Sequence, residues 1–234
     1  MDRQALIEAC RGLRVSDVSD ALDHLGLMDR CLMDPRVRPL WRDTDTFAHR
    51  VAGPALTVRY LPTNREVPNM EGEDFAQYVA DWYRDIAPAP FRDDIRAGDV
   101  LVMDAADQDV GFVGSNNCLG WVSRGAAAVV TNGGARDTDE LIKQRCVVYS
   151  RFISRGFKPG RLEFDTAGVP VNCGGVLVRP GDMVVADGDG VVVVPVEKAP
   201  RVAEIARRVL EGDKRGRRKL YDQAGLPPDP SVAE

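Results

Sequence analysis

The segment from Asp99 to Phe152 constrains the fold most strongly, because short apolar runs alternate there with stretches of helical character. Runs rich in small and β-branched residues predict strands over 99–105, 126–131 and 146–152, with helices near 115–124 and 138–144 between them. Strands that alternate with helices usually pair in parallel through crossover connections. We therefore predict a β-α-β-α-β unit built on a parallel sheet.

Elements of other kinds are predicted on both sides of this unit. The sequence predicts a strand over 51–61 and a helix over 71–86, which Pro88 ends. After residue 169, short apolar runs are separated by Pro-Gly-Asp and Asp-Gly turns, which predicts an antiparallel meander over 169–195. A last helix over 197–211 leads into a charged C-terminal tail, 212–234. With no linker or repeat, 1–234 is predicted to be a single α/β domain with a mixed sheet.

Composition and charge narrow the classes of function. Apolar residues make up 44% of the chain and charged residues 29%, as in ordinary soluble domains. No apolar run approaches the ~18–20 residues of a membrane span, and the first residues lack a secretory pattern. A net charge of −5 disfavours nucleic acid as a partner. Five cysteines without a C-x-x-C pair favour a reducing, cytoplasmic setting.

The first of two informative strand-to-helix junctions lies at Gly114. The glycine allows a tight turn, and Ser115 is expected to cap the helix that follows. The amides of Asn116, Asn117 and Cys118 would then be free donors at the helix start. Such a site favours an anion or a developing oxyanion. An ordinary capped helix would have the same sequence, so both interpretations stay open.

The second junction presents Arg136 and Asp137 at the carboxyl end of a strand, where open α/β sheets usually bind ligands. Gly133 and Gly134 are expected to turn the backbone sharply before them. An arginine can bind a carboxylate through two hydrogen bonds, and an aspartate can hold a hard divalent cation. The pair suits a small anionic substrate that chelates a metal. Alternatively, Asp137 caps the next helix and Arg136 forms a surface ion pair.

Five fragments in a fixed order indicate a family. They are VSDVSDALDHLG (15–26), VAGPALTVR (51–59), AGDVLVMDA (97–105), RGAAAVVTNGGARD (124–137) and VPVNCGGVLVRPGDMVVADGDGVVVVP (169–195). In these fragments the chain resembles the family of the regulator of ribonuclease activity A and the class II pyruvate aldolases, which include 4-hydroxy-4-methyl-2-oxoglutarate aldolases. The resemblance covers most of the chain. It implies a mixed α-β-β-α sandwich of the swivelling β/β/α type.

The resemblance also implies roles for the junction residues. In the aldolases the Arg-Asp pair matches Arg136 and Asp137, with the aspartate helping to hold Mg²⁺ or Mn²⁺ and the arginine contacting the substrate. Asn116 and Asn117 match the oxyanion-hole amides, and Gly114 and Ser115 belong to the same substrate-binding turn. The family places an acidic residue at the position of Ser115, so this chain departs from the family there. Family members form trimers or hexamers with the site at a subunit interface, where Glu204 of a neighbour is the candidate second metal ligand.

Two other groups of residues are open to more than one interpretation. The segment 62–96 is longer than the link usual in the family, which makes it an insertion that is either a solvated helix or a lid that reshapes substrate choice. Asp104 and Asp107 follow a strand and can approach the site, although a structural role is the simpler expectation.

Together, these observations predict a metal-dependent lyase that cleaves a C–C bond of a small 2-oxo acid, by retro-aldol reaction or β-decarboxylation. Two alternatives stay open. One is an isomerase or hydro-lyase acting on a sugar acid, which the serine at position 115 favours. The other is a non-catalytic regulatory protein, which the ribonuclease-regulator branch of the family implies.

Overall fold

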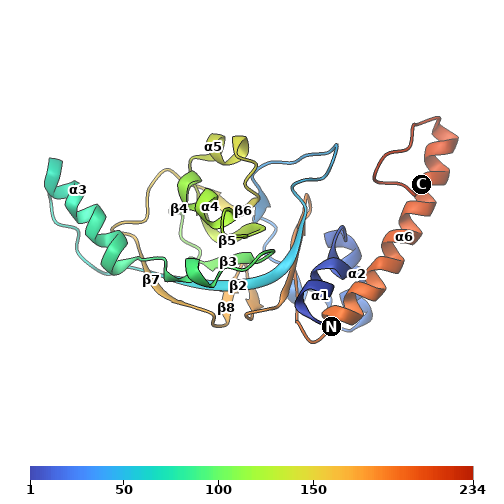
Figure 1. The fold of residues 1–234 in the computed structure, drawn as a ribbon, viewed down its shortest axis with the longest axis horizontal. Helices are drawn as coiled ribbons and strands as arrows, with labels where there is room; N and C mark the ends of the chain where they lie inside the picture. The colour runs from blue at the N-terminus through green and yellow to red at the C-terminus, as the bar shows by residue number, and fades with distance from the viewer. Residues whose placement is uncertain (234) are drawn as a thin grey trace.

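The computed structural model describes residues 1–233, and a mixed β-sheet forms its centre (Figure 1). The sheet order is β1 (Arg38–Pro39), β6 (Val148–Ile153), β5 (Ala128–Ala135), β3 (Val100–Asp104), β2 (Val51–Pro62), β10 (Met183–Asp187) and β11 (Gly190–Val194). Two further strands join at the sides, β4 (Gly111–Val113) against β5 and β7 (Leu162–Ala167) against β2. Strand β7 was not predicted from the sequence.

The predicted β-α-β-α-β unit is confirmed. Strands β3, β5 and β6 pair in parallel, and α4 (Ser115–Val122) and α5 (Thr138–Lys143) connect them. Alternate residues of β3 are buried on opposite faces of the sheet. Leu101 packs in the same cluster as Trp121 of α4 and Leu141 of α5, whereas Val102 packs in a second cluster beneath the sheet.

The expected turn at the two glycines is wrong, because β5 continues through them to Ala135. Gly133 and Gly134 serve close packing inside the strand. A Cβ on Gly133 would lie 2.6 Å from the ring of Phe112, and one on Gly134 would collide with the side chain of Ser154. The strand therefore delivers Arg136 directly from its end.

The C-terminal strands pair antiparallel, as predicted, but they form two hairpins instead of one continuous meander. β8 (Val171–Cys173) and β9 (Val176–Val178) make a separate two-stranded sheet. β10 and β11 pair with each other, and β10 joins the central sheet through β2. Together with the parallel unit, these pairings make the mixed α/β architecture that the sequence predicts.

Helices α1 (Arg3–Cys10), α2 (Val15–His24) and α6 (Ala199–Ala224) pack together at one end of the molecule, with the short turn η1 (Met28–Cys31) after α2 (Figure 1). Helix α6 passes the predicted end at residue 211, so part of the expected tail is helical. The chain then folds back along α6, where Val232 is buried and Arg217 donates a hydrogen bond to the Ser231 carbonyl. This contact stabilises the extra helical turns.

The insertion lies at the opposite end of the longest axis (Figure 1). The predicted helix is confirmed as α3 (Gly72–Asp81) followed by the π-helical turn η2 (Trp82–Ile86), and the 3₁₀ turn η3 (Pro90–Asp94) comes next. Trp82 and Phe91 are buried in the core, and Trp82 Nε1 donates to the Leu162 carbonyl at 3.0 Å. No residue of α3 itself is buried.

Two further expectations from the sequence concern the cysteines and membrane-spanning helices. All five cysteines are buried and unpaired in the part of the chain that the structure describes, as expected for packing thiols. Among residues 1–233, no helix has the length and apolar character needed to cross a bilayer.

Candidate functional site

The two strand-to-helix junctions meet in one cavity of about 300 Å³, here called the junction cavity. It is lined by Tyr83, Gly111, Phe112, Gly114, Asn116, Asn117, Arg136 and Asp137. Most of the residues singled out from the sequence therefore lie together. The cavity sits where β4 and β5 end side by side, because the Arg136 amide donates to the Val113 carbonyl at 3.0 Å.

The first junction differs in detail from its prediction. Gly114, not Ser115, is the N-cap residue, and Ser115 is the first residue of α4. The Cys118 amide donates to the Gly114 carbonyl at 3.0 Å, so it is not a free donor. Asn116 and Asn117 occupy the second and third helical positions, where amides have no partner in a preceding turn. These two amides remain available to a ligand.

Asp137 turns toward the first junction instead of capping its own helix. No side-chain cap is formed on α5, whereas the Ser115 amide donates to Asp137 Oδ2 at 3.2 Å and the Ser115 hydroxyl lies 3.5 Å from the same oxygen. A Cβ on Gly114 would lie 2.8 Å from that oxygen, so only glycine leaves room for the carboxylate. Asp137 also has a left-handed backbone, with φ of 54°. Aspartate adopts this conformation more readily than most non-glycine residues.

Arg136 and Asp137 form the cation–anion pair of the site. Arg136 Nε lies 3.4 Å from Asp137 Oδ1, and each side chain is 38% exposed. The pair is therefore loose and open to the cavity. An incoming carboxylate can displace part of this contact and bind the guanidinium through two hydrogen bonds.

The insertion supplies the opposite wall through Tyr83 of η2. Burial raises the pKa of the Tyr83 hydroxyl, so this group stays protonated and can donate a hydrogen bond. Its place in the cavity was not predicted, because the sequence indicated only that position 83 falls within the helix over 71–86.

A side cavity of about 330 Å³ adjoins the junction cavity and shares Tyr83, Phe112 and Asn117 with it. Arg84, Arg92 and Lys158 line it as well. Lys158 is only 4% exposed, and its ammonium donates to the Ala87 carbonyl at 2.9 Å. Burial lowers the pKa of Lys158 to about 8, and Arg92 adds to this effect. Lys158 gave no sequence signal, because a lone lysine in a loop belongs to no pattern.

Two further candidate groups lie outside the junction cavity of their own chain. Glu204 sits on α6, pairs with Arg201 at 2.5 Å and with Arg208, and does not line the junction cavity of its own chain.

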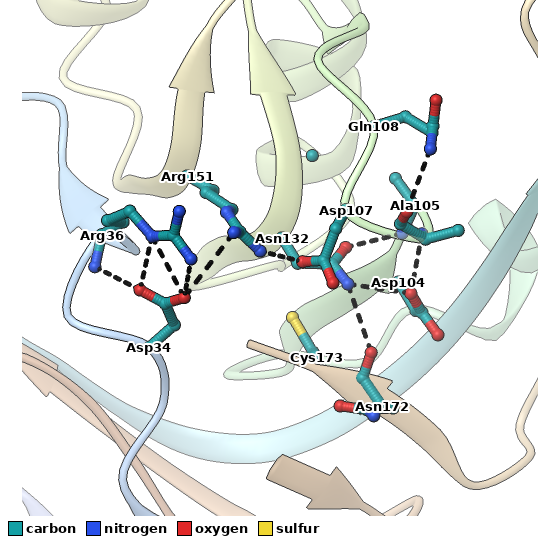
Figure 2. Close-up of polar contacts among 12 residues, drawn as sticks. Asp34, Arg36, Asp104, Ala105, Asp107, Gln108, Asn132, Arg151, Asn172 and Cys173 are labelled. Atoms are coloured by element: carbon teal, nitrogen blue, oxygen red, sulfur yellow. Dashed lines mark hydrogen bonds and ion pairs between the residues drawn. The ribbon is translucent and has the colours of Figure 1, made fainter. Parts of the chain in front are cut away.

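Asp104 and Asp107 do not line the cavity either, which agrees with the simpler expectation of a structural role. Figure 2 shows the group that holds them. Asn132 Nδ2 donates to Asp104 Oδ1 at 2.9 Å, and Asp107 pairs with Arg151. Buried Asn132 thus ties these strand ends together, and the two carboxylates have structural partners.

The donor set can be tested against a divalent cation. Among the described residues of one chain, no group of three or more His, Cys, Asp or Glu side chains converges. The cavity offers one carboxylate, Asp137, with the Ser115 hydroxyl beside it. Mg²⁺ is commonly held by one or two carboxylates, several waters and substrate oxygens. The residues therefore fit Mg²⁺ or Mn²⁺ bound weakly by one chain, and they do not fit a closed zinc site.

Comparisons with known proteins identify the family of the chain. The RraA-like family model, described as Aldolase/RraA, matches residues 15–193. A Halalkalibacterium halodurans protein named "Putative 4-hydroxy-4-methyl-2-oxoglutarate aldolase" is 28% identical over 215 residues, which cover 91% of this chain and 87% of that protein. An uncharacterized Methanocaldococcus jannaschii protein is 34% identical over 98 residues, covering 42% of this chain and 46% of the relative.

Solved structures show the same fold. The crystal structure of a Pseudomonas syringae pv. tomato protein matches with a TM-score of 0.72 and 26% identity, covering 96% of this chain and 94% of that one. Streptomyces coelicolor RraAS2, described as an unusual member of the RNase ES inhibitor RraA family, matches with a TM-score of 0.70 and 24% identity, covering 95% and 98%.

Proposed function

The chain belongs to the RraA-like family, and we propose that it is a divalent-metal-dependent lyase that cleaves a C–C bond of a small 2-oxo acid. The observation that carries this proposal is the junction cavity. There the Arg136 guanidinium and the Asp137 carboxylate face the start of α4. Cleavage by retro-aldol reaction or β-decarboxylation leaves a pyruvate enolate, and the Arg136 guanidinium and the amides at the start of α4 are groups that can stabilise its negative charge.

The roles of the residues follow from their positions. Arg136 binds the carboxylate and 2-oxo oxygens of the substrate, and the amides of Asn116 and Asn117 donate to the developing enolate oxygen. The Ser115 amide fixes the Asp137 carboxylate toward the cavity. A Mg²⁺ or Mn²⁺ bound by Asp137 would supply Lewis-acid polarisation of the 2-oxo group. A water molecule is the proton acceptor in this scheme.

The insertion 62–96 forms one wall of the junction cavity through Tyr83, and this wall selects which substrates fit. Tyr83 lines both the junction cavity and the side cavity, where Arg92 and Lys158 supply positive charge, whereas the charge of Arg84 is paired with Asp81 and Asp85. A substrate whose pyruvyl end occupies the junction cavity would place its other end there. We therefore propose that this end is anionic or strongly polar.

The proposal includes a cytoplasmic homo-oligomer, a trimer or hexamer, with no nucleic-acid or membrane partner. Asp137 is the only carboxylate that lines the junction cavity among the described residues. A second carboxylate from a neighbouring subunit, for which Glu204 is the candidate, would strengthen metal binding. This role requires the ion pairs of Glu204 with Arg201 and Arg208 to rearrange.

The test is a titration with Mg²⁺ or Mn²⁺, followed by assay of pyruvate release from oxaloacetate and from 4-hydroxy-2-oxo acids. Metal-stimulated release is expected in the wild type, and Asp137→Asn should abolish the stimulation. Asp139→Asn is the matched control, because Asp139 is exposed on α5 and does not line the cavity. Equal stimulation in both variants would contradict the proposal.

A non-catalytic regulatory protein is the second candidate. Two observations favour it, namely the serine where the family's aldolases have an acid and the lack of three converging metal ligands among the described residues. It predicts no pyruvate release and no rise in melting temperature with Mg²⁺ or Mn²⁺. Metal-dependent turnover of a sugar acid, without pyruvate release, would instead indicate an isomerase or hydro-lyase.

A further inference from the structure

An acidic arm projects from one end of the molecule. The arm, residues 66–81, contains α3 and carries Glu66, Glu71, Glu73 and Asp74. None of these four carboxylates forms an ion pair among the described residues. The arm therefore presents uncompensated negative charge to its surroundings.

Helix α3 has two unlike faces. Phe75, Tyr78 and Val79 share one side at helical spacing, and the Phe75 ring lies 6.2 Å from that of Phe157. Glu73 lies on the opposite side, Asp74 lies at the edge between the two sides, and both are exposed. A ten-residue helix with no buried residue gains little from packing, and isolated helices of this length are marginal in water. A partner on the acidic side would stabilise it.

A basic groove lies at the other end. This cavity of about 550 Å³ is lined by Arg11, Gly12, Arg14, Thr46, Phe47, Arg50, Leu210, Lys214, Arg217, Pro230 and Ser231. Glu8 pairs with Arg11, and Asp17 and Asp213 pair with Arg14. Arg50, Lys214 and Arg217 have no acidic partner among residues 1–233.

The state of Arg50 shows that the groove is electrostatically incomplete. Its guanidinium stacks 3.7 Å above the Phe47 ring, and its Nε is buried without a hydrogen-bond partner. A buried donor left unpaired costs about 1–3 kcal/mol. Beside the cations, Phe47, Leu210 and Pro230 supply an apolar floor. The groove thus matches a ligand with carboxylates next to apolar groups.

The arm has this composition, but it cannot reach the groove of its own chain. Helix α3 and the α1, α2 and α6 end lie at opposite ends of the longest axis (Figure 1). We propose that the acidic arm of one copy docks in the basic groove of the next copy, head to tail. A heterologous contact of this kind closes into a ring when the rotation between copies allows it. The inference goes beyond the proposed function, which includes an oligomer but specifies no such contact.

The test is charge reversal followed by sedimentation velocity at several protein concentrations. Glu73→Lys/Asp74→Lys on the arm, and separately Lys214→Glu/Arg217→Glu in the groove, should each raise the concentration for half-dissociation by about tenfold or more. The four substitutions combined should restore assembly. Asp93→Lys/Glu140→Lys, which makes the same charge change at exposed positions outside the arm, should assemble like the wild type. High salt should weaken the wild-type contact.

Cross-linking tests the contact without relying on charge. Asp74→Cys with Lys214→Cys, treated with a short bismaleimide, should give covalent dimers and closed rings on a denaturing gel, whereas either cysteine alone should not. The five native cysteines are buried and should react slowly. A monomeric wild type, unchanged assembly in both reversed variants, or failure of the cross-link would overturn the proposal. Saturable binding of inorganic phosphate to the assembled protein, lost in Lys214→Glu/Arg217→Glu, would also overturn it, since an anion would then fill the groove.

Discussion

The two walls of the junction cavity are built in different ways. The sheet wall, with Arg136, Asp137 and the start of α4, is fixed by main-chain hydrogen bonds between β4 and β5 and by the bond from the Ser115 amide to the Asp137 carboxylate. The insertion wall, with Tyr83, depends on buried anchors such as Trp82 and leads into an arm without a buried residue. Groups that must hold a reacting atom need rigid support, whereas groups that select substrates tolerate a movable one. The sheet wall should therefore control the rate of the reaction, and the insertion wall should control which substrates fit the cavity.

The largest effect is expected at the sheet wall. Arg136→Ala should lower kcat/KM for pyruvate release by about 10³-fold, since loss of one donor to a developing oxyanion costs 10²–10³ in rate. Arg136→Lys should recover only part of this, because an ammonium cannot make the paired hydrogen bonds. Steady-state kinetics would measure both variants, and Arg124→Ala on the outer surface is the control. Activity close to that of the wild type in Arg136→Ala would show that the sheet wall does not hold the enolate.

Lys158 anchors the insertion wall through its hydrogen bond to the Ala87 carbonyl, and its titration should change the free energy of unfolding. Its pKa falls from 10.5 in the unfolded chain to about 8 in the folded one, because burial disfavours the ammonium. The unfolded state thus binds more protons between about pH 8 and 10.5, so folding stability rises with pH in this window. Relative to Lys158→Met, the wild type should gain roughly 1–3 kcal/mol from pH 7.5 to 10.5.

Urea unfolding at several pH values would measure this difference in the free energy of unfolding. The corresponding difference between the wild type and Lys143→Met, on exposed α5, should not change with pH. If the difference between the wild type and Lys158→Met also does not change with pH, the ammonium stays hydrated in the folded protein. The insertion wall would then be looser than its contacts indicate.

The metal affinity should respond to position 115. Ser115→Asp should tighten Mn²⁺ binding by about tenfold, because a second carboxylate raises the charge facing the cation. Without metal the same variant should be less stable, since two carboxylates would face each other where the hydroxyl now lies 3.5 Å from Asp137 Oδ2. Titration calorimetry would measure the affinity, with Ser115→Asn as the uncharged control. Equal affinities in the two variants would place Ser115 away from the cation.

The same contrast explains what the sequence could predict. The parallel unit was predictable because Val100, Leu101, Val102 and Met103 belong to a short apolar run with β-branched residues, a pattern typical of a buried strand. Arg136 and Asp137 were predictable because they follow such a strand directly. The turn predicted at Gly133 and Gly134 was wrong, because glycine is used both in turns and where side chains pack closely. Only the positions of Phe112 and Ser154 in the folded protein show that close packing applies here. Tyr83 and Lys158 meet through tertiary packing between segments far apart in the chain, which no local pattern encodes.

The smallest effect is expected at the insertion wall and gives the sharpest test of the comparison. Tyr83→Phe removes a protonated hydroxyl from the boundary between the two cavities and keeps the ring. One neutral hydrogen bond is worth about 1 kcal/mol, so KM should rise about fivefold with kcat unchanged. Tyr221→Phe is the control, because the Tyr221 hydroxyl donates to Asp229 and does not line either cavity. If kcat falls instead while KM stays constant, the hydroxyl takes part in proton transfer, and the insertion wall belongs to the chemistry as much as the sheet wall does.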